Sequence, residues 1–296
     1  MSERNEIFKD DVPVFKTADQ KPNVDPRIPS ISREEAARQE FDLSAPPDEV
    51  APLPSGGKTY PSNHPWSQSE VIYFRGMTTK EENILTNKAL IKNGTMITEL
   101  LKSSILDKRV NPLDLLSGDR NAIMVAIRAS GYGADYKVKA TCPSCGDVNQ
   151  EPTFNLADLE VKRLDIDPIQ PGTNAFQFVL PKSKKNVVFK FLTGRDEEEI
   201  QANADRMKKI KLADPDAAVI STALFASILS VDGITDRAKI RQFIDVMPAR
   251  DSLALRNFMR DHDPGLIMRQ EMKCTSCGES TEVPIPIGVS FFWPST

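Results

Sequence analysis

Two short cysteine turns constrain this chain more than any other feature of its sequence. KATCPSCGD contains Cys142 and Cys145, and MKCTSCGES contains Cys274 and Cys277. All four cysteines of the 296 residues lie in these turns, and each pair has the pattern Cys-x-x-Cys-Gly between extended runs. The glycine permits a tight turn with backbone N–H groups directed at sulfur. Two such turns supply the four soft ligands of a tetrahedral site, so the pattern predicts one zinc ion held by all four cysteines.

The separation of the turns predicts how the fold is organised. Between Cys145 and Cys274 lie 128 residues, against about 15–20 in an ordinary zinc ribbon. Closing a loop about eight times longer costs only about 2 kcal/mol more, whereas structural zinc contributes roughly 10–16 kcal/mol in small domains. We therefore expect residues 153–265 to be inserted between two halves that meet in space.

Other interpretations of the cysteines stay open at this point. They could be unligated buried thiols, a redox pair or a rubredoxin-like iron site. Thioredoxin-type motifs start a helix rather than lie between strands, which disfavours the redox pair. A thiol oxidoreductase predicts cysteines that react with thiol reagents without chelation, whereas zinc predicts protection until the metal is removed. Four cysteine ligands leave zinc no open position for water, so we expect a structural ion.

The first 65 residues differ from the rest in composition. Residues 1–65 carry 8 Lys/Arg, 12 Asp/Glu and ten of the 22 prolines, whereas residues 66–296 carry 30 charges of each sign. An acidic, proline-rich segment cannot bury enough apolar surface to order by itself. We expect an extended arm, either a solvated tail or a segment that orders against a partner, with one short helix at residues 31–41.

The remaining sequence predicts an α+β fold: a zinc-stapled β-rich portion, a mainly helical insertion and the extended N-terminal arm. Helices and the first cysteine turn are expected in residues 66–152, a β-hairpin and helices in 153–265, and the second turn with an aromatic tail in 266–296. Further expectations are a strand at residues 71–74, a capping box at Thr78 and Glu81, a helix with Ser117 as N-cap and Gly131 as its stop, a hairpin over 176–193, and a core helix over 217–231 with Asp214 at its cap and Pro215 at its first position.

Charge and residue inventory disfavour three classes of function. The neutral body has no basic footprint for a nucleic acid. The longest apolar run, residues 217–231, is too short to span a bilayer, and the N-terminus has no secretory signal. The chain has only two histidines, His64 and His262, and offers no nucleophile with a plausible base. We expect neither membrane association nor enzymatic activity.

The end of the chain carries a family resemblance. It reads PIPIGVSFFWPST, and a Phe-Phe-Trp-Pro tail behind a Cys-x-x-Cys-Gly strand pair resembles the T-even-type baseplate (hub and hub-assembly) proteins of contractile bacteriophage tails. Three more stretches fit: LLSGDRNAIMVAIRASGYGADY, FKFLTGRDEEEI and ILSVDGITDRAKIRQFIDVMPARDSLALRNFM. Together these stretches span about residues 70–294, and the proline-rich arm departs from the pattern.

The resemblance implies a structural or assembly component of a tail baseplate, located in the virion and, during assembly, in the host cytoplasm. Its partners would be other tail and baseplate proteins, with several copies in the assembly. The residues that carry these roles are Cys142, Cys145, Cys274 and Cys277 as metal ligands, and Phe291, Phe292 and Trp293 as a packing or docking anchor. The aromatic residues could equally fold back onto their own core. The alternatives are a zinc-ribbon nucleic-acid-associated protein and a transient assembly chaperone absent from the virion.

Overall fold

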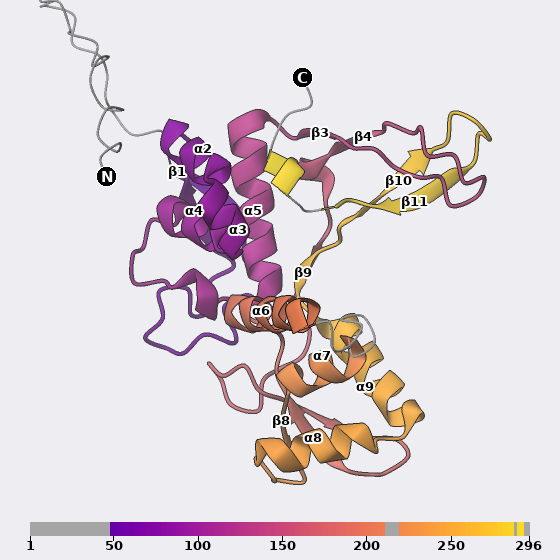
Figure 1. The fold of residues 1–296 in the computed structure, drawn as a ribbon. Coiled ribbons are helices and arrows are strands. Elements are labelled where there is room, and N and C mark those ends of the chain that lie inside the picture. Colours follow the sequence, from indigo (N-terminus) through magenta and orange to yellow (C-terminus); the bar gives the residue numbers. More distant parts are fainter. Residues whose placement is uncertain (1–47, 211–218, 287–288, 293–296) are drawn as a thin grey trace, which may run out of the picture. The chain divides into compact units, whose positions relative to one another are not determined.

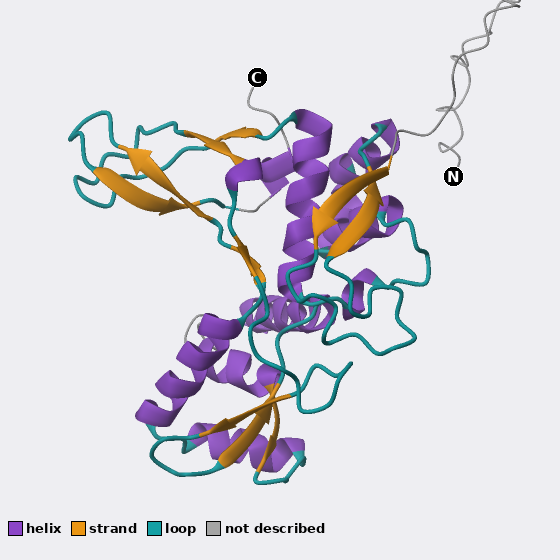
Figure 2. Ribbon diagram, turned by 180° about the vertical axis from the view of Figure 1, so that it is seen from behind, coloured by secondary structure: helices purple, strands orange, loops and turns teal. Residues whose placement is uncertain are grey.

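The computed structural model describes residues 48–210, 219–286 and 289–292, all within a unit that begins at Pro46 (Figures 1 and 2). The helix expected at residues 31–41 and the cap expected at Asp214 and Pro215 lie outside the described residues. Helices and short β-ladders are mixed along the described chain, which confirms the α+β class.

The described body consists of short strands and helices. The strands are β1 (Asp48–Pro52), β2 (Val71–Arg75), β3 (Asp135–Lys137), β4 (Thr153–Asn155), β5 (Val161–Lys162), β6 (Phe176–Val179), β7 (Asn186–Phe189), β8 (Ile228–Val231), β9 (Gly265–Leu266), β10 (Arg269–Lys273) and β11 (Ser280–Pro284). The helices are α2 (Thr79–Thr86), α3 (Lys88–Asn93), α4 (Met96–Ser104), α5 (Ser117–Tyr132), α6 (Gly194–Ile210), α7 (Val219–Ser227), α8 (Arg237–Asp245) and α9 (Ala249–His262), with 3-10 turns η1 (Pro112–Asp114), η2 (Leu156–Asp158) and η4 (Val289–Phe292).

Strands β1 and β2 correct the predicted boundary of the N-terminal arm. They pair antiparallel, with Val50 opposite Tyr73. Ala51 and Leu53 have no exposed surface and belong to the larger hydrophobic core. Residues 48–65 are therefore part of the folded body, and the arm does not extend to residue 65. The prediction took a high proline content to mean an unfolded segment, but proline is also compatible with edge strands and turns.

Helix α5 lies at the centre of the larger core. Figure 1 shows it beside β1 and helices α2–α4, and Ile123 and Ile127 on this helix have no exposed surface. The helix begins at Ser117 itself rather than after it, and it continues through Gly131 to Tyr132. The predicted stop at Gly131 is therefore wrong by one to two residues.

A second, smaller core lies in the insertion. Strands β6, β7 and β8 form a three-stranded antiparallel sheet with helices packed beside it (Figure 2). The core helix predicted over residues 217–231 is only partly correct, because α7 ends at Ser227 and Ile228–Val231 form β8. Pairing with β7 decides this: Val231 lies opposite Val187 and Ile228 opposite Phe189, and all four side chains are buried. No described helix is long and apolar enough to cross a membrane.

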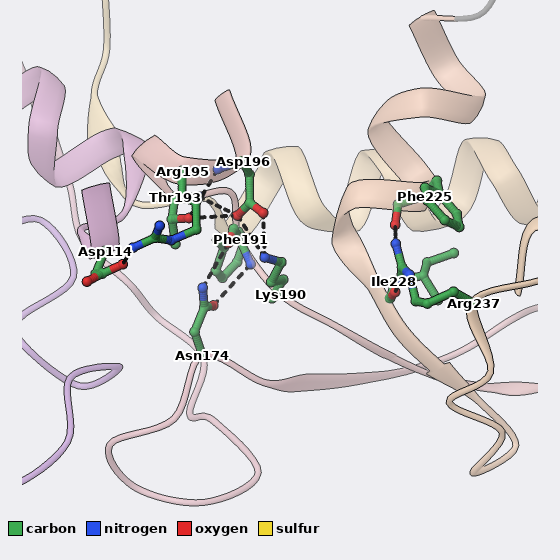
Figure 3. A network of polar contacts seen from close by, with 10 residues as sticks. All are labelled: Asp114, Asn174, Lys190, Phe191, Thr193, Arg195, Asp196, Phe225, Ile228 and Arg237. Atoms are coloured by element: carbon green, nitrogen blue, oxygen red, sulfur yellow. Dashed lines mark hydrogen bonds and ion pairs between the residues drawn. The ribbon is translucent and has the colours of Figure 1, made fainter. Parts of the chain in front are cut away.

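Two capping boxes fix helix starts in the body. Thr78 and Glu81 form the predicted box at α2, which is confirmed. At α6, Thr193 N–H donates to Asp196 Oδ2 at 2.9 Å, and Asp196 N–H donates to Thr193 Oγ1 at 3.4 Å (Figure 3). Lys190 Nζ lies 2.6 Å from Asp196 Oδ1. The TGRDEEE stretch is thus a capped and charge-paired helix start.

Candidate metal centre

The first cysteine turn continues from the ladder of β3 and β4. Ala140 N–H donates to the Gln150 carbonyl at 2.9 Å and closes the base of the loop. Within the loop, Cys142 N–H donates to the Asp147 carbonyl at 2.8 Å, and Gly146 N–H donates to the Cys142 carbonyl at 2.9 Å. These bonds hold the chain in a tight knuckle that presents both sulfur atoms.

The second turn repeats this geometry at the end of β10 and β11. Cys274 N–H donates to the Glu279 carbonyl at 2.9 Å, and Gly278 N–H donates to the Cys274 carbonyl at 3.0 Å. Gly146 and Gly278 both have φ 76°, and an added Cβ at either would meet no atom within 4 Å. The left-handed backbone, not lack of space, therefore requires glycine at both turns.

The fold brings the two knuckles together. Figure 1 shows the loop between β3 and β4 beside the β10–β11 hairpin. All four Sγ atoms lie within 4.8 Å of one another. The Cys142 and Cys277 sulfurs are 3.9 Å apart, and those of Cys145 and Cys274 are 3.7 Å apart. The first cysteine of each turn is buried and the second is exposed, and none forms a disulfide.

These distances fit a tetrahedral metal ion. Zinc binds thiolates at about 2.3 Å, so the sulfur–sulfur edges of a regular tetrahedron are about 3.8 Å long. Separations of 3.7 Å and 3.9 Å bracket that value, and each joins one knuckle to the other. An all-sulfur donor set suits zinc or iron rather than magnesium or calcium.

The electrostatics of the thiols also favour a cation between them. Backbone N–H groups of Cys277 and Ser276 lower the pKa of the Cys274 thiol to about 7. For Cys145, the Asp147 N–H favours the thiolate, but desolvation and the other three thiols outweigh it and raise its pKa to about 12. A cation bound among the four sulfur atoms would favour their thiolate forms.

A polar contact between the knuckles had no signal in the sequence. The Gln150 side chain is 3% exposed, and its Oε1 accepts from Thr275 N–H at 2.9 Å and from Thr275 Oγ1 at 3.0 Å. Its Nε2 donates to Asp147 Oδ2 at 2.7 Å, and the same carboxylate accepts from the Ser276 hydroxyl. Burial of this glutamine depends on the neighbouring knuckle, more than 120 residues away, so local pattern could not reveal it.

The aromatic tail folds back onto its own core. Phe291 and Phe292 have no exposed surface, and the Phe291 ring meets the Tyr136 ring edge-on at 5.1 Å. The buried Arg128 on α5 donates from Nε to the Phe291 carbonyl at 3.0 Å and from Nη1 to the Gly133 carbonyl at 2.8 Å. Trp293 lies outside the described residues. A docking role for Phe291 and Phe292 would require η4 to leave this core, and it stays a prediction.

Both histidines have partners with a structural role. His64 Nδ1 accepts from Trp66 N–H at 3.2 Å, and the His64 ring stacks on Tyr60 at 4.6 Å. His262 lies at the end of α9, with its Nδ1 2.7 Å from Asp165 Oδ1. His64 therefore stabilises a turn, and His262 fixes the end of α9.

Cys274→Ser should expose the first knuckle as well as the second. If the two turns share an ion, losing one ligand removes the link that orders both. Hydrogen exchange on the zinc-loaded chain should show faster exchange at Gly146 and Cys142, whose N–H groups are bonded within the first knuckle. Ser144→Ala, an exposed change in the same turn, serves as the control. Unchanged protection at Gly146 in Cys274→Ser would mean that the turns do not share an ion.

Phe291→Ala should destabilise the body strongly. Truncating a fully buried phenylalanine costs about 3–5 kcal/mol, to be measured by urea unfolding. Tyr73→Ala removes a ring of similar size that is 58% exposed, so its cost should be about 1 kcal/mol or less. Equal small losses for both variants would contradict the packing of η4 and would favour a docking role for the tail.

Comparison with known proteins gives one family. No curated protein and no solved structure matches the chain significantly. The model of a family described as "T4 bacteriophage base plate protein" matches residues 49–293, which covers nearly all of the described body and both cysteine turns. The chain therefore belongs to this family and is a T4-type bacteriophage baseplate protein, a structural component of a phage tail.

Proposed function

We propose that this chain is a non-enzymatic architectural subunit of the hub region of a contractile tail baseplate, stabilised by one structural zinc ion. The family match over residues 49–293 is the observation that carries the baseplate role. The four converging sulfur atoms are the observation that supports the proposed zinc ion. The hub position rests on the sequence resemblance alone.

Zinc would act here as a link between distant parts of the chain. Cys142 and Cys145 precede the insertion and Cys274 and Cys277 follow it, so one ion closes a loop that contains all of the second core except Leu116. The knuckles themselves are small β-ladders with little core of their own, a setting in which metal binding contributes much of the folding free energy. All four ligands are protein sulfurs, so the ion supplies stability and no reaction.

One of the most deeply buried carboxyl groups of the described chain has structural partners. The deeply buried Asp119 carboxylate accepts from Tyr60 Oη at 2.5 Å and from Ser55 N–H at 2.9 Å. Burial raises the pKa of Asp119, and the two hydrogen bonds oppose that rise. These bonds anchor Ser55 and Tyr60 to α5, which is a structural role for this carboxylate.

Two other functions compete with a permanent baseplate subunit. A zinc-ribbon nucleic-acid-binding protein would need a basic face, and residues 66–296 carry equal numbers of positive and negative charges. A transient assembly chaperone has no charge requirement and fits the family equally well. We favour the permanent subunit because residues 1–47, which precede β1, are long and proline-rich, as is suited to an arm that orders against neighbouring subunits.

Quantitative mass spectrometry of purified phage particles should detect this chain in a fixed ratio to other baseplate proteins. The infected-cell lysate is measured in parallel. Several copies per particle are expected, because baseplate parts repeat around a symmetric tail. Abundance in the lysate with absence from particles would contradict the permanent role and identify an assembly factor. A chain that co-purifies with nucleic acid in a salt-dependent manner would favour the zinc-ribbon nucleic-acid-binding protein.

A further inference from the structure

The two knuckles are related by near-identical backbone geometry, but their side-chain contacts are not symmetric. Adding 132 to a residue number converts the first turn into the second, so that Cys142 corresponds to Cys274 and Gly146 to Gly278. The rule ends before Gln150: Gln150 pairs with Ala140, whereas Met272, the counterpart of Ala140, pairs with Thr281, so the first loop is one residue longer. Gln150 is buried between the turns. The first turn therefore supplies the buried amide, and the second turn supplies the backbone N–H and the hydroxyls that bond to it and to Asp147.

Proline explains why the contact between a backbone N–H and a side chain runs from the second turn to the first. The residue that donates its N–H to Gln150 is Thr275, directly after Cys274. Its counterpart in the first turn is Pro143, which has no N–H to donate. The second turn can thus be held through its backbone by a side chain of the first, and the reverse contact is not available.

We infer that Gln150 is a positioning residue for the proposed metal site, because it fixes the second knuckle against the first through Thr275. The inference rests on the proposed zinc function. Three bonds converge on the Gln150 amide, at 2.9, 3.0 and 2.7 Å. Asp147, which receives the third bond, also accepts from Ser276 in the opposite turn. Gln150 and Asp147 therefore connect Thr275 and Ser276, the two residues after Cys274, to the first turn.

This arrangement prepares the four sulfur atoms for one ion. Cys274 shares its peptide bond with Thr275, so holding the Thr275 N–H limits where the Cys274 sulfur can lie. Cys274 is also the thiol whose sulfur lies 3.7 Å from that of Cys145 in the other turn. Partners that orient metal ligands in this way are commonly worth about 10- to 100-fold in metal affinity.

The test uses the full chain and zinc competition with a chromophoric chelator. Gln150→Leu keeps a similar volume and removes all three bonds, so zinc affinity should fall by about 10- to 100-fold. Thr275→Val removes only the hydroxyl bond and keeps the backbone N–H, so its loss should be smaller. Val148→Ala, an exposed change in the same loop (Val148 is 62% exposed), should bind zinc as the unmodified chain does.

A second readout separates positioning from general destabilisation. Co²⁺ substituted into the site reports ligand geometry through its visible absorption bands, which a distant loss of stability does not alter. Gln150→Leu should shift or weaken these bands, and Val148→Ala should leave them unchanged. If Gln150→Leu does not fold, Thr275→Val carries the test through a smaller change in the same direction.

The outcomes distinguish this inference from the proposed function. Wild-type zinc affinity and an unaltered Co²⁺ spectrum in Gln150→Leu would overturn the positioning role and leave the metal site intact. Failure of the unmodified chain to bind zinc or Co²⁺ would overturn the proposed metal function itself. A reduced zinc affinity with an altered Co²⁺ spectrum in Gln150→Leu, together with a smaller loss of affinity in Thr275→Val, would support both the positioning role and the proposed metal site.

Discussion

The meeting of the two cysteine knuckles is the constraint on which the rest of the structure depends. It joins the segment that follows α5 to the segment that follows the insertion, across 128 residues of chain. The sulfur separations of 3.7 and 3.9 Å both join one knuckle to the other. A metal ion at this point would fix both ends of the insertion, so that the second core is held as a closed loop.

Helix α5 and the C-terminal turn η4 form a second link between distant parts of the chain. Arg128 is 2% exposed, and its guanidinium donates to carbonyls of Phe291 and Gly133. A buried guanidinium is tolerated when backbone acceptors satisfy it, so the C-terminal segment supports α5 as much as α5 supports it. In a baseplate subunit such links would keep the body rigid while neighbouring subunits bind its surface.

The sequence was most informative where local chemistry decides the structure. The capping box at Thr78 and the strand–turn–strand setting of both cysteine pairs are readable from a few neighbouring residues. The β8 strand was missed because its apolar residues also fit a helical stripe, and pairing with Val187 and Phe189 settled the outcome. Gln150 was missed for a related reason, since its partner Thr275 is distant in sequence. Phe291 and Phe292 are conspicuous in sequence, but only packing shows that they are covered.

The central claim is that four cysteine sulfurs hold one structural zinc ion. X-ray absorption at the zinc edge of the purified full chain tests it most directly, because it counts the ligand atoms and measures their distance. The account predicts one zinc per chain with four sulfur neighbours at about 2.3 Å. Nitrogen or oxygen neighbours in place of sulfur, or a chain that retains no zinc after purification, would contradict it.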